Sequence, residues 1–213
     1  MLACTWCVVG YAQPRPATPA PTVECSNAAR APSAAYAAHI ASIDRELGIP
    51  PGYGESHGLT LVPEPATLAD AGKDLRGRTV KLAPAAAAAL KRMTAAAAKD
   101  GVTLQIVSGF RSAAYQAALL RTKLNRGMSI ATALSINTPP GYSEHQSGCA
   151  VDLATPHSPA ADQSFARTPA YAWLNRHAAG YGFHLSYPPT NAHGIEFEPW
   201  HWRYVAPVQS GRR

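Results

Sequence analysis

Apolar and polar positions along the chain follow helical spacing in some segments and alternate in others. Residues 85–100 are rich in Ala, follow Pro84, which suits the first turn of a helix, and stop at Gly101. Residues 102–107 alternate and carry β-branched side chains, so they predict a strand. Further helices are expected over residues 35–47, 112–126, 129–136 and 169–179, and further strands over 79–82, 149–153, 183–186 and 196–205.

This mixture of separate helices and short strands favours the α+β class. Residues 53–77 and 137–148 show no regular period and are expected to form loops. A length of 213 residues suits one domain rather than two. No apolar run approaches the ~18–20 residues that a membrane-spanning helix needs.

The two ends of the chain differ from its middle. Residues 1–13 are apolar and close with a small residue, which is typical of the apolar part of an export signal, although its usual basic start is missing. Residues 14–34 are dominated by Pro, Ala, Ser and Thr and predict a linker. We therefore expect a leader, a linker able to tether the protein to the envelope, a zinc peptidase domain over residues 35–207, and a basic tail over 208–213.

Charge and cysteine content narrow the function classes. Only 15% of the residues are charged, and 19 Lys and Arg against 13 Asp and Glu give a net charge of +6. The basic residues are scattered without interleaved aromatic residues, so we expect no nucleic-acid partner, and the charge suits the anionic bacterial envelope. Four cysteines do not make a disulfide scaffold. Cys149 could be a buried apolar residue, a zinc ligand or a partner of Cys25, and the sequence leaves these readings open.

Two segments carry side chains that bind metals. The first, SEHQSGCAVD, spans residues 143–152 and contains His145 and Asp152; the second, EPWHWR, begins at residue 198 and contains His201. Two imidazoles and one carboxylate form a ligand set of catalytic zinc sites, which keep one position open for water. Gly148 lies between the first two candidate ligands and lets the chain turn there.

Glu198 stands three residues before His201, so on a regular strand the two side chains would point to opposite faces. Pro199 interferes with regular pairing, and a turn there would bring both side chains towards the metal. A carboxylate beside a metal-bound water can act as a general base. Among the other histidines, His184 and His193 are the ones expected to make contacts around the site or with substrate.

Taken together, these segments resemble the VanY-type D-alanyl-D-alanine carboxypeptidases. These are zinc peptidases of the bacterial cell wall, related to D,D-dipeptidases and more distantly to lysostaphin-type enzymes and the hedgehog signalling domain. The resemblance covers about residues 75–206. The matching blocks are SGFRS from residue 108 with Tyr115 and Gln116, PGYSEHQSG from 140, AVDL from 150, residues 168–174, YGF from 181, and EPWHWRY from 198.

The resemblance implies a small central antiparallel sheet flanked by helices, with a zinc site in a cleft over the sheet. The implied ligands of one zinc ion per chain are His145, Asp152 and His201. It implies Glu198 as the general base and Arg111 as a cation that binds the oxyanion or the substrate's C-terminal carboxylate. The residues implied to line the carboxylate end of the pocket are Gln116 and Ser143. Arg111 could instead form a salt bridge at the helix entry, and Ser143 could cap a turn.

The activity implied by the resemblance is removal of the C-terminal D-alanine from peptidoglycan stem peptides, with a metal-bound water as nucleophile. We expect an exported monomer in the periplasm or cell envelope. Alternatives are an L,D-carboxypeptidase, a D,D-dipeptidase, an endopeptidase, or a non-catalytic zinc-containing module that binds peptidoglycan. Glu198 and Arg111 argue against the last, because a structural zinc site needs neither.

Overall fold

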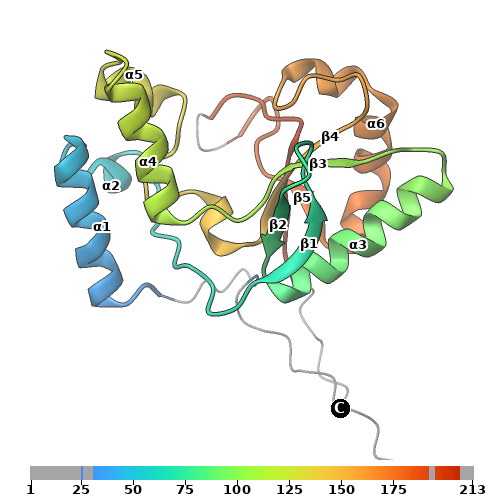
Figure 1. Cartoon of the computed structure of the whole chain (residues 1–213), viewed down its shortest axis with the longest axis horizontal. Coiled ribbons are helices and arrows are strands. Elements are labelled where there is room, and N and C mark those ends of the chain that lie inside the picture. Colours follow the sequence, from blue (N-terminus) through green and yellow to red (C-terminus); the bar gives the residue numbers. More distant parts are fainter. Residues whose placement is uncertain (1–24, 26–30, 192–194, 207–213) are drawn as a thin grey trace, which may run out of the picture.

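The computed structural model describes residue 25, residues 31–191 and residues 195–206 (Figure 1). Its centre is a four-stranded antiparallel sheet in the order β3-β4-β6-β5. The strands of this sheet are β3 (Gln105–Ser108), β4 (Ala150–Ala154), β5 (Phe183–Leu185) and β6 (His201–Tyr204). A separate antiparallel hairpin, β1 (Ala69–Lys73) with β2 (Thr79–Leu82), meets the sheet through a bridge between Asp74 and Ile106.

Helices lie on either side of these strands. The α-helices are α1 (Ala34–Leu47), α2 (Tyr53–Ser56), α3 (Pro84–Lys99), α4 (Ala113–Leu124), α5 (Ile130–Ser135) and α6 (Pro169–His177). The 3-10 helices are η2 (Glu144–Ser147), η3 (Gln163–Arg167) and η4 (Ala178–Tyr181). In the described part of the chain, no helix combines the length and apolar character that crossing a membrane requires. The predicted α+β class with a small antiparallel sheet is confirmed.

The structure differs from the expected elements in three places. Strand β1 lies in a segment predicted to be loop, because its sequence, ADAGK, has no β-branched or aromatic side chain. The strand predicted over residues 102–107 begins at Gln105, since the Val102 amide donates to the Ala97 carbonyl and closes α3. The strand predicted over residues 196–205 forms only from His201, because the chain turns at Pro199.

The apolar core has two parts. One surrounds the sheet and includes the buried face of α3, where small Ala side chains allow close packing, together with α6. The other joins α1, α4 and α5, which lie together on one side of the molecule (Figure 1). The chain passes from the second part to the first through η2, which carries a predicted zinc ligand.

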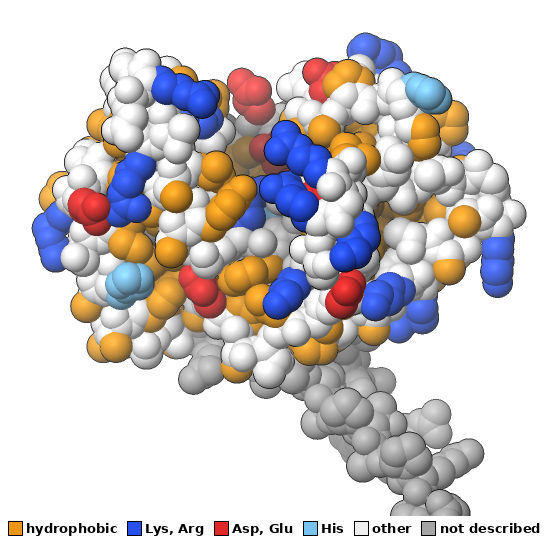
Figure 2. Space-filling view, viewed as in Figure 1, with side chains coloured by type: hydrophobic (Ala, Val, Ile, Leu, Met, Phe, Trp, Pro, Cys, Tyr) orange, Lys and Arg blue, Asp and Glu red, His pale blue; other side chains and the backbone are white. Residues whose placement is uncertain are grey.

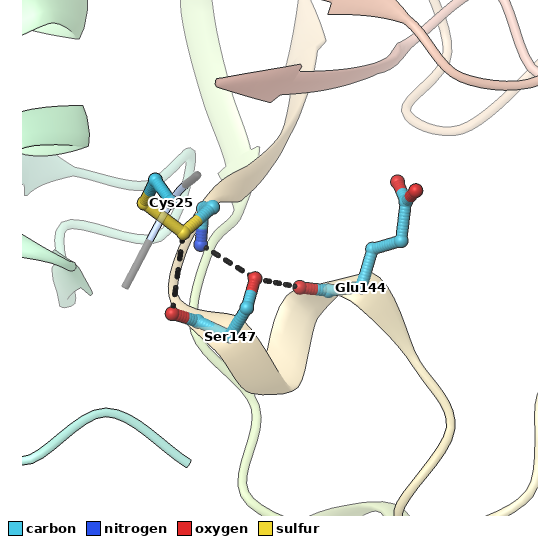
Figure 3. The surroundings of a disulfide bond; sticks show 4 residues. Cys25, Glu144 and Ser147 are labelled. Carbon is cyan, nitrogen blue, oxygen red and sulfur yellow. Dashed lines mark hydrogen bonds between the residues drawn. A yellow bond between two sulfur atoms is a disulfide. The ribbon is translucent and has the colours of Figure 1, made fainter. Parts of the chain in front are cut away.

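A disulfide bond joins Cys25 to Cys149, 124 residues later in the chain (Figure 3). Cys25 is buried, and its carbonyl accepts a hydrogen bond from the Ala206 amide at 2.8 Å. The question that the sequence left open for Cys149 is thereby answered: it pairs with Cys25. The predicted leader, the basic tail and most of the predicted linker lie outside the described residues.

Candidate active site

A short capped helix places His145. Ser143 begins η2 with a capping box, in which its side chain accepts from the Gln146 amide and the Gln146 side chain accepts from the Ser143 amide. Gly148 ends η2 in the left-handed conformation, with φ of 69°, and its carbonyl accepts from the Ala83 amide at 2.9 Å. The His145 ring is therefore held on a rigid turn that leads directly into β4.

The other two predicted ligands face each other across the sheet. Asp152 on β4 and His201 on β6 are register partners in an antiparallel pair, so their side chains leave the same face. All three side chains are buried, and their candidate ligand atoms lie within 4.8 Å of one another. The structure thus brings together the three residues that the sequence separates by up to 56 positions.

The distances suit a tetrahedral zinc ion. Asp152 Oδ1 lies 3.2 Å from His145 Nε2 and 3.1 Å from His201 Nδ1. Ligand atoms bound to one tetrahedral zinc ion at about 2.0–2.2 Å are about 3.3 Å apart. His145 Nδ1 donates to the Gly109 carbonyl at 2.7 Å, which leaves Nε2 as the atom with a free lone pair. The donor set and its spacing therefore fit zinc.

Burial and mutual contacts set the charges of these groups. Burial lowers the pKa of His145, which favours the neutral imidazole that a metal needs. Burial opposes ionisation of Asp152, but the two histidines hold the pKa of its carboxyl well below the usual range. Burial also opposes protonation of His201, yet hydrogen bonds to Asp152 and Glu144 raise its pKa to about 9. In the metal-free protein, the positive charge of the cluster therefore resides on His201.

Glu198 lies beside this cluster, as the sequence predicted from Pro199. The His201 amide donates to the Glu198 carbonyl at 3.1 Å, so the chain turns between them. This turn leaves Glu198 Oε2 3.9 Å from His201 Nδ1. Burial raises the pKa of Glu198, and the negative charges of Asp152 and Glu144 add to the effect. A carboxyl with a raised pKa beside the ligand atoms can both accept and return a proton.

Arg111 reaches the same cluster from the segment between β3 and α4. Its Nη1 donates to Ser108 Oγ at 2.9 Å and lies 3.4 Å from Asp152 Oδ2. Its amide donates to the His145 carbonyl, so the two segments are also joined through the backbone. The buried Nε of Arg111 has no hydrogen-bond partner among the described residues. The guanidinium therefore keeps a donor that a substrate oxygen could use.

Gln116 and Ser143 are both buried and make internal hydrogen bonds. Gln116 Nε2 donates to the Thr138 carbonyl at 2.8 Å, while its Oε1 has no partner within the described structure. Ser143 caps η2, as the simpler interpretation of the sequence allowed. Both side chains thus shape the segment that precedes His145.

Sequence reasoning missed the residues that surround His201. Glu144 Oε2 accepts from His201 Nε2 at 2.8 Å, and the Tyr187 ring packs against the His201 ring with 4.9 Å between centroids. Glu144 could have been suspected from its position next to a predicted ligand, whereas nothing in the sequence marked Tyr187. His184, expected near the site, lies exposed on β5, and His193 is outside the described residues.

Comparison with known proteins shows what the chain resembles. The family model of VanY, D-alanyl-D-alanine carboxypeptidase, matches residues 79–207. A D-alanyl-D-alanine carboxypeptidase of Enterococcus faecalis (strain ATCC 700802 / V583) is 34% identical over 122 residues, which are 52% of this chain and 43% of that protein. The chain spans about half or less of the length of the curated relatives it matches.

Solved structures share the fold. The LdcB LD-carboxypeptidase matches with a TM-score of 0.61 at 31% identity, over 67% of this chain and 70% of that one. The D,D-pentapeptidase VanY from a VanB-type resistance cassette, solved in complex with Zn(II), matches with a TM-score of 0.52 at 30% identity, over 68% of this chain and 83% of that one. Since the family model covers more than half of the chain, and with it all the predicted zinc ligands and Glu198, the chain belongs to the VanY D-alanyl-D-alanine carboxypeptidase family.

Proposed function

We propose that this protein is a zinc-dependent carboxypeptidase that removes the C-terminal D-alanine from peptidoglycan stem peptides. The observation that carries the proposal is the spacing of His145, Asp152 and His201, about 3.2 Å between neighbouring ligand atoms, with the Glu198 carboxylate beside them. The family supports the carboxypeptidase activity, and a VanY structure in complex with D-alanine-D-alanine supports the substrate class.

One zinc ion held by these three side chains would lower the pKa of a water molecule and polarise the peptide carbonyl. Glu198 Oε2 then accepts the proton that the water loses and passes it to the amine of the departing D-alanine. The raised pKa of Glu198 supports this role, because the carboxyl must be able to carry a proton near neutral pH. Asp152, whose pKa is held low, stays ionised as a ligand throughout.

Arg111 is proposed to bind negative charge on the substrate. Its Nη1 is engaged by Ser108 and Asp152, which leaves the unpartnered Nε and the remaining guanidinium hydrogens for the developing oxyanion or the C-terminal carboxylate. Gln116 and Ser143 are proposed to line the carboxylate end of the pocket, and the unpaired Oε1 of Gln116 could accept from the substrate's peptide N–H.

A second activity, L,D-carboxypeptidase action on tetrapeptide stems, is favoured by the similarity to the LdcB LD-carboxypeptidase. Digestion of defined muropeptides, followed by mass spectrometry, separates the two. Release of D-alanine from pentapeptide but not tetrapeptide stems supports the first proposal, and the reverse pattern supports the second. Dipeptide release would indicate a D,D-dipeptidase, and cleavage of cross-linked dimers an endopeptidase. A parallel digest with a chelator tests the metal requirement, and binding without any hydrolysis would identify a non-catalytic module.

We further propose that the protein works outside the cytoplasm, in the periplasm or cell envelope, as a monomer and with its N-terminal segment available as a tether. The disulfide between Cys25 and Cys149 supports this location, because such bonds persist in oxidising compartments. Lys and Arg side chains gather over the β1–β2 hairpin, near the middle of one face (Figure 2). Beside the hairpin, a pocket of about 350 Å³ is lined in part by Arg78, Lys81 and Arg111, which suits the carboxylates of stem peptides.

A further inference from the structure

The Glu144 carboxylate lies on the side of His201 that faces away from the predicted zinc ligands. Its Oε2 accepts hydrogen bonds from His201 Nε2 at 2.8 Å and from Ser186 Oγ at 2.7 Å. Its Oε1 lies 3.6 Å from Arg203 Nη1. Both carboxylate oxygens are therefore occupied, and their partners come from β6 and from the segment that follows β5.

The contact with Glu144 decides which nitrogen of His201 can bind a metal. A neutral imidazole carries one proton, so one ring nitrogen donates and the other offers a lone pair. Because a carboxylate only accepts, Glu144 keeps the proton on Nε2 and leaves the lone pair on Nδ1. That nitrogen is the one that lies 3.1 Å from Asp152 Oδ1, among the other candidate ligand atoms.

The two histidines of the site are oriented by different kinds of acceptor. His145 Nδ1 donates to the backbone carbonyl of Gly109 at 2.7 Å, a neutral group that no side-chain substitution removes. His201 relies on a charged side chain, which orients the ring and also makes the imidazole a stronger electron donor. The affinity of the site for a metal should therefore depend on Glu144.

We propose that Glu144 is a positioning residue, which holds the His201 ring in the tautomer and orientation that metal binding through Nδ1 requires. Ser186 and Arg203 in turn fix the carboxylate. This inference rests on the zinc site proposed above. Glu144 does not compete with Glu198 for proton transfer, because its two oxygens already have partners.

The test compares zinc affinities of the parent, Glu144→Ala and Glu144→Gln, measured by competition with a chromophoric chelator. We expect Glu144→Ala to bind zinc about 10–100-fold more weakly. Glu144→Gln should lie between the two, since its amide oxygen still accepts from Nε2 but carries no charge. The visible absorption of the cobalt(II)-substituted protein should change in the same order. Glu46→Ala is the matched control, because Glu46 is 62% exposed and pairs only with Arg121 on α4.

Metal-free unfolding of each variant separates positioning from a general structural role. A structural role alone would lower the free energy of unfolding and leave the zinc affinity of the folded protein unchanged, which would overturn the inference. Glu144→Gln retains the shape of the side chain, so it decides the question if Glu144→Ala does not fold. A parent that takes up no zinc would overturn the proposed function and this inference together, whereas equal affinities in parent and variants would overturn the inference alone.

Discussion

The two carboxyl groups nearest the predicted zinc position, those of Asp152 and Glu198, are driven in opposite directions by their surroundings. Both lose water on burial, but only Asp152 is compensated, by two histidines, so its pKa falls while that of Glu198 rises. A pair of acids whose pKa values are pushed apart can divide the work of a hydrolase. Asp152 is suited to remain a charged ligand, and Glu198 is suited to move a proton.

Replacing Glu198 by Ala should reduce kcat by about 10²–10⁴-fold, because the variant lacks the group that takes the proton from water. Zinc content should stay at the parental level, since Glu198 is not one of the three clustered ligands. Turnover of a pentapeptide stem and metal analysis of the same preparation check both statements. Glu196→Ala is the control, because Glu196 is exposed two residues away. Parental turnover in Glu198→Ala would rule out the assigned base.

Zinc uptake at pH 6 should release about one proton per ion. In the metal-free protein the pKa of His201 is raised to about 9, so the ring is protonated at pH 6 and must lose the Nδ1 proton to bind. The pKa of His145 is lowered and that of Asp152 is far below 6, so these two contribute little. Affinity should accordingly rise with pH up to about 9.

Calorimetry in two buffers of different protonation enthalpy measures this proton release. The same raised pKa should stabilise the metal-free fold below about pH 6.5, and this contribution should disappear as the pH rises through about 9. Uptake without proton release, with an affinity that is the same at pH 6 and pH 8, would contradict the charge state derived for His201.

At the level of single residues, sequence patterns identified groups within motifs better than contacts between motifs. His145 and Asp152 share one segment, and Pro199 gave a physical reason for Glu198 to face His201. The contact between Glu144 and His201 joins residues 57 positions apart, and Ser186 lies 42 positions from Glu144. Such pairs depend on how β5 and β6 are placed, which no local pattern contains.

Among the secondary-structure elements, the turn between η2 and β4 controls the site most directly. It connects His145 to Asp152, and Gly148 occupies a left-handed conformation at its centre. A Cβ added at Gly148 would lie 2.9 Å from the Ala83 backbone nitrogen, whose N–H donates to the Gly148 carbonyl. The turn is therefore fixed both by its own backbone conformation and by the chain that leads into α3.

Gly148→Ala should destabilise the metal-free protein by about 2 kcal/mol or more, and Gly101→Ala by about 1 kcal/mol. Both residues have positive φ, which costs a non-glycine residue about 1–2 kcal/mol. Only Gly148 also meets backbone atoms, because nothing lies within 4 Å of a Cβ at Gly101. Displacing Ala83 would add the loss of a hydrogen bond, about 1 kcal/mol. Urea unfolding of both variants checks the difference, and equal losses would contradict the crowding argument.

The elements themselves followed from the sequence where their own residues determine them. Helix α3 formed as predicted from Pro84, its Ala run and Gly101, because these are local preferences. Strand β1 was not predicted, since its pairing depends on β2, where Ala69 lies opposite Leu82. The strand expected over residues 196–205 was shortened because the amides of Glu198 and His201 bond within a turn rather than to a neighbouring strand.

On the scale of the whole molecule, the disulfide encloses much of the fold in one covalent loop. The loop from Cys25 to Cys149 contains α1, the β1–β2 hairpin, α3, β3, α4, α5 and η2, and therefore spans both parts of the apolar core. Cys25 itself is buried against the sheet, while α1, which follows it in sequence, packs in the other part. The bond thus restricts how far these two parts can separate in the unfolded chain.

Removing this bond should lower the free energy of unfolding by about 2–5 kcal/mol, because a cross-link over so long a loop reduces the entropy of the unfolded chain. Urea unfolding of the metal-free parent, oxidised and reduced, and of the Cys25→Ala/Cys149→Ala variant measures the effect. The reductant should leave the variant unchanged. Zinc affinity of the folded variant should stay close to that of the oxidised parent, because neither cysteine belongs to the clustered ligands. A variant as stable as the oxidised parent would show that native contacts alone hold the two parts together.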